Sequence, residues 1–186
     1  HTAHEVTLVG KGVGSSALQT NLPHAKPLQA NGEQTLARLA ASGQMISVYT
    51  DASYKAGREI GAYGWVVGVR GGNTKTGHFL PLVCGGGWEQ GSNNIARKLS
   101  STRLEKLAIL SVCTFLKETG ITRANIHADN QSANKWFNDR HHLHGNWYDW
   151  WTKPHNDLDA TLQARTQGME GFNVYWVRGH VEDRKK

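Results

Sequence analysis

Apolar residues gather in short runs in the part of the chain that begins at Met45, and these runs predict a sheet. The β-branched run at 46–50, "ISVYT", has the composition of a buried strand. Two further runs, at 61–70 and 76–86, are separated by turn residues that include Gly71-Gly72-Asn73. Glycine and asparagine favour tight turns, so we expect the three runs to form an antiparallel meander.

The chain then changes to a helical period. Residues 100–120 carry an apolar face made of Leu104, Leu107, Ala108, Leu110, Val112, Phe115 and Leu116, and Gly120 is suited to end the helix. A strand at 123–129, a short helix at 130–139, a helix at 155–168 and a strand at 172–177 are expected to follow. This order predicts an α/β fold with a five-stranded mixed sheet, three strands antiparallel and two added in parallel, and helices on both faces.

Residues 1–44 differ in character from the rest. They are rich in Gly, Ser, Asn and Pro and show no sustained period, so we expect an extended or loosely packed arm with one short helix at 32–43. The sequence thus divides into an N-terminal extension or linker of unknown function, 1–44, and a folded domain, 45–186.

Composition limits the class of protein and of partner. The chain has 186 residues and a formal net charge of +6, which is compatible with a polyanionic partner. Two cysteines do not make a disulfide framework, and no apolar run approaches the length of a membrane span. We therefore expect a monomeric, cytoplasmic protein in a reducing compartment, with no membrane partner.

Three acidic residues occupy positions at the ends of elements. Asp51 follows the first strand, Glu105 lies in the first turns of the long helix, and Asp129 follows the fourth strand. Each has an ordinary structural explanation, as a turn former, a partner of the helix dipole and a helix N-cap. A right-handed crossover, however, returns the fourth strand parallel to the first, with Asp51 and Asp129 about 5 Å apart. Carboxylates at that spacing repel one another unless a divalent cation binds them, and oxygen ligands suit Mg²⁺ or Mn²⁺.

With these residues in place, residues 45–181 resemble the type 1 ribonuclease H domain of the ribonuclease H-like superfamily. The motifs that carry the resemblance are "YTDASY", "GAYGWVV", "SSTRLEKLAIL", "IHADNQSANKWF" and "YWVRGHV", in this order. Asp51, Glu105 and Asp129 match three of the four metal-binding acids of the family. His180 matches a histidine of the family that assists product release or proton transfer.

The resemblance also implies contacts with nucleic acid. Ser100, Ser101 and Arg103 match a stretch that touches the nucleic-acid backbone, and Gln131 matches a minor-groove contact. The fourth acid of the family lies on a terminal helix about ten residues after the histidine, whereas this sequence stops six residues after His180. Asp183 is the candidate substitute, with Glu182 as an alternative; otherwise the terminal helix has been removed by truncation, or the site lacks its fourth acid and binds metal defectively.

The function that the resemblance implies is hydrolysis of the RNA strand of RNA–DNA hybrids. Two Mg²⁺ ions, or Mn²⁺ in their place, would take part, and the products would carry a 5′-phosphate and a 3′-hydroxyl. One alternative is a ribonuclease H-like module that binds hybrid or a protein partner but cuts weakly or not at all. Another keeps the fold and cuts DNA, as a transposase or resolvase does. An upstream polymerase domain is a further candidate partner.

The segment 138–154 is rich in histidine and tryptophan where many family members carry a basic protrusion. Trp147 and Lys153 are candidate nucleic-acid contacts, since aromatic rings stack on bases and lysine neutralises phosphate. The tryptophans could equally be core residues or part of a partner surface. His141, His142 and His144 lack a well-spaced fourth ligand for a transition metal. The glycine-rich stretch 85–93 lacks the Lys-Ser/Thr of a phosphate-binding loop.

Overall fold

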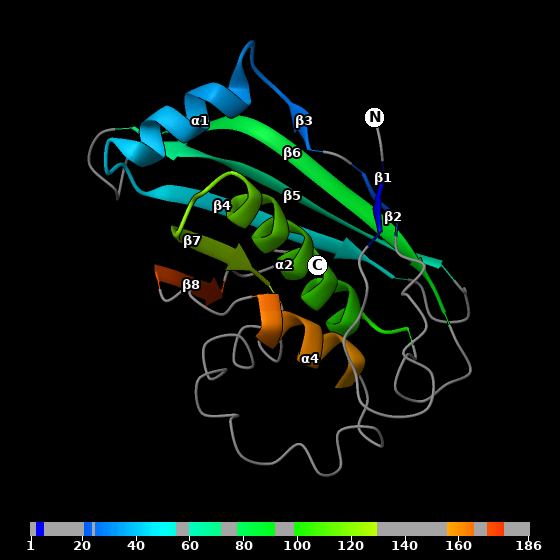
Figure 1. Cartoon of the computed structure of the whole chain (residues 1–186). Coiled ribbons are helices and arrows are strands. Elements are labelled where there is room, and N and C mark those ends of the chain that lie inside the picture. The colour runs from blue at the N-terminus through cyan, green and yellow to red at the C-terminus, as the bar shows by residue number, and fades with distance from the viewer. Residues whose placement is uncertain are drawn as a thin grey trace, which may run out of the picture.

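Three long antiparallel strands form the centre of the sheet in the computed structural model, which describes residues 3–5, 21–23, 25–54, 60–71, 78–91, 99–129, 156–165 and 171–176. β4 (Ile46–Ser53) pairs with β5 (Ile60–Arg70), and β5 pairs with β6 (Phe79–Gln90). These strands confirm the predicted meander (Figure 1).

Two parallel strands extend the sheet beyond β4. β7 (Arg123–Ala128) lies beside β4, and β8 (Gly171–Trp176) lies beside β7. The resulting order, β6-β5-β4-β7-β8, is the five-stranded mixed sheet that the sequence predicts. The parallel return of β7 next to β4 is what brings the ends of these two strands to the same edge.

β4 and β6 are longer than expected from the apolar runs. β6 continues through three consecutive glycines, 85–87, to Gln90, so most of the glycine-rich stretch 85–93 is strand. The glycines are required by close packing: a Cβ on Gly85 would lie 2.3 Å from the Trp65 ring, and one on Gly86 would lie 2.5 Å from the carbonyl oxygen of Tyr63. The glycines at 85 and 86 therefore reflect close contact with β5 and do not form a turn.

The N-terminal residues that the structure describes add to the β6 edge. β1 (Ala3–Glu5) pairs with β2 (Asn21–Pro23), and both β2 and β3 (Lys26–Pro27) pair antiparallel with β6. α1 (Gly32–Ala41), which confirms the predicted short helix, buries Leu36 completely and contacts β6. The division of the chain at residue 44 remains a prediction.

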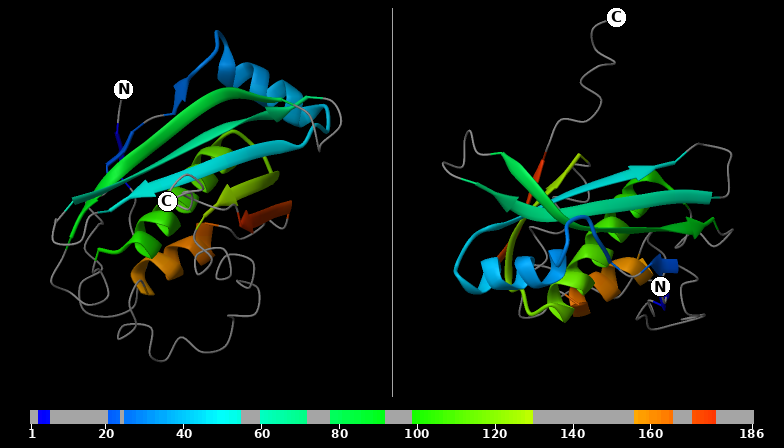
Figure 2. Two further views of the ribbon diagram at one scale, coloured as in Figure 1. Left: turned by 180° about the vertical axis from the view of Figure 1, so that it is seen from behind. Right: turned by 90° about the horizontal axis from the view of Figure 1, so that it is seen from above.

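α2 (Ser101–Glu118) is the central helix. Its apolar face packs on β4, β5 and β6, and the helix also contacts α4 (Asn156–Arg165). The Trp65 indole N–H donates to Ser111 Oγ at 2.8 Å and ties β5 to the helix. α1, α2 and α4 lie on one face of the sheet in Figure 2, and no described helix covers the other face. The helix expected at 130–139 lies outside the described residues.

Among the helices in the described ranges, none is both long and apolar enough to cross a membrane. Cys84 and Cys113 are both free thiols, the first half-buried and the second buried.

Candidate metal centre

Three carboxylates from three different elements meet at the carboxyl ends of β4 and β7. The candidate ligand oxygens of Asp51, Glu105 and Asp129 all lie within 4.8 Å of one another. The parallel pairing of β4 with β7 ends at Tyr49 and His127, two residues before each aspartate. Asp51 lies within β4 rather than at its last residue, because pairing with β5 continues to Ser53. The meeting of the three acids is what the sequence predicts.

Glu105 is the most deeply placed of the three acids. Its side chain comes from the second turn of α2, and the residue is only 3% exposed. Burial, then a hydrogen bond with Asp129, and then the negative charges of Asp129 and Asp51 raise the pKa of Glu105 from its ordinary value of 4.5 to about 8. In the absence of a cation, the Glu105 carboxyl therefore holds a proton at neutral pH.

The hydrogen bonding of Glu105 is incomplete. Its Oε2 is buried and has no hydrogen-bond partner among the described residues. An unsatisfied buried carboxylate oxygen is costly unless a ligand completes its coordination. A donor set of carboxylate oxygens alone, on acids of which one has a buried oxygen with no partner in the described structure, fits a hard divalent cation such as Mg²⁺ or Mn²⁺. The residues present therefore fit the metal that the sequence implies.

The residues before Glu105 have different environments. Ser100 caps α2, with its Oγ accepting the Arg103 backbone N–H at 3.1 Å, and it is half-buried. Ser101 is exposed at the start of the helix. Arg103 is fully buried and its guanidinium binds Glu89, so the direct nucleic-acid contact expected of its side chain does not fit this position. The reason is that β6 is long enough to place Glu89 opposite the first turn of α2.

Glu89 is not among the residues that the sequence singles out, because the stretch 85–93 around it is distinguished only by its glycines. The signal that could have found it is the alternation along β6: Val83 and Glu89, six residues apart, are both buried, whereas Trp88 and Gln90 on either side of Glu89 are exposed. Five other candidate residues, Gln131, Trp147, Lys153, His180 and Asp183, lie outside the described residues, as do the histidines of 138–154.

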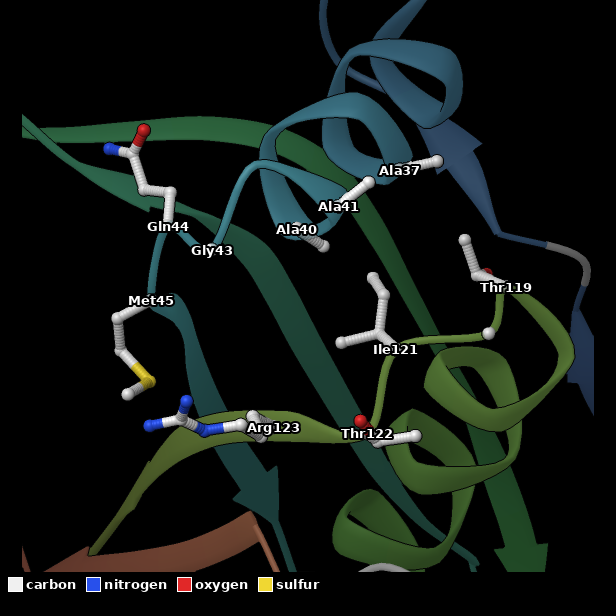
Figure 3. A pocket seen from close by; sticks show the side chains of 11 residues that line it. Ala37, Ala40, Ala41, Gly43, Gln44, Met45, Thr119, Ile121, Thr122 and Arg123 are labelled. Carbon is white, nitrogen blue, oxygen red and sulfur yellow. The ribbon is translucent and has the colours of Figure 1, made fainter.

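A separate cavity of about 260 Å³ lies at the opposite ends of the same two strands. It is lined by Ala37, Ala40 and Ala41 of α1, by residues 43–45 and by residues 119–123, as Figure 3 shows. None of the three carboxylates lines it. Met45 precedes β4 and Thr122 precedes β7, whereas the acids follow the paired part of these strands, so the cavity is not part of the metal centre.

Comparison with known proteins gives a likeness of structure only. No family model matches the chain, and no curated protein matches it in sequence. It is similar to the solved structure of RNase H1 from the halophilic archaeon Halobacterium salinarum NRC-1, with 14% identity, a TM-score of 0.48 and coverage of 75% of this chain and 90% of that one. It is also similar to an N-terminal RNase H domain from Mycobacterium tuberculosis, solved as a fusion with maltose-binding protein, with 14% identity, a TM-score of 0.47 and coverage of 75% and 86%.

The fold itself is decided by the strand order of the sheet. A three-stranded meander, a helix that crosses to a strand parallel to the first, and a fifth strand parallel to the fourth are all present. The chain has a ribonuclease H-like fold. In this ribonuclease H-like domain the acidic cluster could hold a metal ion.

Proposed function

We propose that this chain is a divalent-metal-dependent ribonuclease H that hydrolyses the RNA strand of RNA–DNA hybrids. The observation that carries the proposal is the meeting of Asp51, Glu105 and Asp129 at one sheet edge, with a buried Glu105 oxygen that has no partner in the described structure. Two bound Mg²⁺ ions would supply Lewis-acid stabilisation of the charge that develops on the phosphate during hydrolysis.

Each acid has a distinct part in this proposal. Asp51 and Asp129 are fixed by the backbone of β4 and β7, so they hold the metals at a set place relative to the sheet. Glu105 approaches from α2 and must release its proton to become a ligand. Asp183 is proposed as the fourth acid, and His180 as the group that assists proton transfer or product release.

The surroundings of the site and the net charge support a nucleic-acid substrate. Ser101 is exposed at the N-terminus of α2, where the positive end of the helix dipole favours a phosphate. Gln131 is proposed to contact the minor groove, where the 2′-OH distinguishes RNA from DNA. Trp147 and Lys153 are proposed to contact the second strand. The net charge of +6 favours association with a polyanion.

The proposal is tested by cleavage of four labelled duplexes: RNA–DNA hybrid, RNA duplex, DNA duplex and a hybrid with a single ribonucleotide. We expect cleavage of the RNA strand of the hybrid in Mg²⁺ or Mn²⁺, with 5′-phosphate and 3′-hydroxyl ends. Asp51→Asn should reduce the rate at least about 100-fold, because the metal ions that stabilise the developing charge lose a ligand.

Glu105→Gln should abolish cleavage, whereas Glu33→Gln, which makes the same change at an exposed residue of α1, should leave the rate unchanged. Hybrid binding without turnover in either metal would favour the binding module over the enzyme. Cleavage of DNA duplex in preference to hybrid would favour a DNA-cutting enzyme of the same fold.

A further inference from the structure

Arg103 and Glu89 form a buried ion pair between the first turn of α2 and the end of β6. Arg103 Nε lies 3.0 and 2.9 Å from the two carboxylate oxygens of Glu89, and Nη2 lies 2.8 Å from Oε1. The two side chains are 0% and 4% exposed. A guanidinium that donates from two nitrogens to one carboxylate fixes both the distance and the orientation of the groups.

Stability alone does not account for such a pair. Removing both charges from water costs about as much as their attraction returns, and an apolar pair of similar volume usually packs at least as stably. An ion pair fixes the orientation of its two side chains relative to each other, and an apolar pair does not. The Arg103–Glu89 pair is therefore expected to matter where the orientation of α2 relative to the sheet matters.

A second contact beside the pair holds the same part of α2. Glu89 is directly opposite Gly61 in the pairing of β5 with β6. Leu104, the next residue after Arg103, lies over Gly61 so closely that a Cβ there would be 2.3 Å from Leu104 Cδ1. Two consecutive residues of the helix thus dock on one cross-strand pair. The first turn of α2 is held against both translation and rotation at this point.

The rotation of the helix matters because Glu105 comes two residues after Arg103. At about 100° per residue, the two side chains leave α2 on nearly opposite sides. A rotation of the helix by about 20° would move a carboxylate about 5.5 Å from the axis by about 2 Å. Ligands of a metal site must be held to about 0.5 Å. Arg103 on one side of the helix thus sets the position of Glu105 on the other.

We propose that Arg103 and Glu89 are positioning residues for the metal centre, which fix the rotation of α2 so that the Glu105 carboxylate meets Asp51 and Asp129. This inference rests on the proposed function, since it concerns the same three acids. It assigns to Arg103 an indirect part in the site in place of a contact with nucleic acid.

The first test is the Mn²⁺ affinity of Arg103→Lys, measured by calorimetry on the full chain. Lysine keeps the charge but loses the two-nitrogen contact, so we expect Mn²⁺ affinity at least tenfold below wild type. Arg38→Lys, the same change at an exposed residue of α1, should match wild type. Wild-type Mn²⁺ affinity in Arg103→Lys would overturn the inference.

The second test separates positioning from stability. The double variant Glu89→Leu/Arg103→Met replaces the ion pair with apolar side chains. We expect its melting temperature without metal to equal or exceed that of wild type, its Mn²⁺ affinity to fall at least tenfold, and its kcat on hybrid to fall with KM little changed. Full Mn²⁺ affinity in a stable double variant would overturn the inference. If the double variant fails to fold, Arg103→Lys decides.

Wild type and Asp51→Asn, measured side by side, separate this inference from the proposed function. Mn²⁺ binding by wild type that is lost in Asp51→Asn establishes the centre whatever the pair does. Full binding by the Arg103 and Glu89 variants would then overturn the positioning role alone. Absence of Mn²⁺ binding by wild type would overturn the proposed function and this inference with it.

Discussion

Glu105 is the residue at which packing and charge oppose each other most directly. Between about pH 4.5 and 8, the folded chain without metal keeps a proton on this carboxyl that the unfolded chain has released. Folding then takes up a proton, so the free energy of unfolding falls as pH rises through this window, by up to about 1.4 kcal/mol per pH unit. Below the window both states hold the proton, and above it neither does.

Urea unfolding in chelator at several pH values between 5 and 8 measures this slope, and Glu105→Gln provides the control. Glutamine resembles the protonated carboxyl and cannot ionise, so the part of the slope due to this residue should disappear. At pH 8 the variant should be at least as stable as wild type without metal and yet gain nothing from added Mn²⁺. Equal slopes in the two proteins would contradict the assigned protonation state.

The meeting of the three acids could be predicted from the sequence, but the burial of the side chains around them could not. Asp51, Glu105 and Asp129 could be predicted because each follows from the order of strands and helices. The burial of Glu105 and of Arg103 could not, because it depends on which side chains of β5 and β6 lie under the first turn of α2. A motif shows that an arginine is present and not where its guanidinium points.

Among the elements, the N-terminus of α2 combines two tasks at Ser100. This serine caps the helix through its Oγ, and it also matches a residue that touches nucleic acid. Ser100→Ala should destabilise the protein by about 1 kcal/mol, since the cap is lost. Ser100→Asp keeps a capping oxygen but adds negative charge where a phosphate is expected.

The two Ser100 variants therefore separate the tasks. In urea unfolding, Ser100→Asp should stay close to wild type and Ser100→Ala should not. In hybrid binding measured in chelator, Ser100→Asp should be the weaker of the two. Equal hybrid binding by wild type and Ser100→Asp would mean that no phosphate approaches this end of α2.

The glycine run of β6 is a packing requirement of the sheet. A Cβ on Gly86 would lie 2.5 Å from the Tyr63 carbonyl oxygen, which belongs to the backbone and cannot rotate away. We expect Gly86→Ala to lower the free energy of unfolding by about 1–3 kcal/mol. Gly71→Ala is the matched control, because nothing lies within 4 Å of a Cβ there. Equal denaturant midpoints for the two variants would contradict this packing.

The same glycines explain why element boundaries were predicted less well than element order. Strands at β4, β5, β7 and β8 carry apolar or β-branched runs, and their period is visible in the sequence. β6 has glycine at 85 and 86 because the Trp65 ring lies against the first and the Tyr63 carbonyl oxygen lies against the second. Glycine normally indicates a turn. A strand that has glycines because neighbouring groups pack against it therefore resembles a loop in the sequence alone.

For the whole molecule, the described part of residues 25–44 lies against the sheet of the domain. The sequence predicts an arm that is separable from residue 45 onward. In the structure, however, α1 buries Leu36 completely, β3 pairs with β6 at Val83 and Cys84, and a Cβ on Gly32 would lie 2.3 Å from the Leu82 carbonyl oxygen. Contacts this close are typical of a structural part of a domain and not of a linker.

We therefore predict different outcomes for two truncations. Removal of residues 1–24 takes away β1 and β2 but leaves β3 and α1 on the sheet, and it should cost little stability. Removal of residues 1–44 also uncovers Leu82 and the edge of β6, and loss of the fully buried Leu36 alone is worth about 2–5 kcal/mol. An exposed strand edge also favours aggregation, so the shorter protein should be less soluble. Denaturant unfolding and light scattering measure both effects. If the protein without residues 1–44 were as stable and as soluble as the full chain, α1 would be an appendage and the boundary at residue 44 would stand.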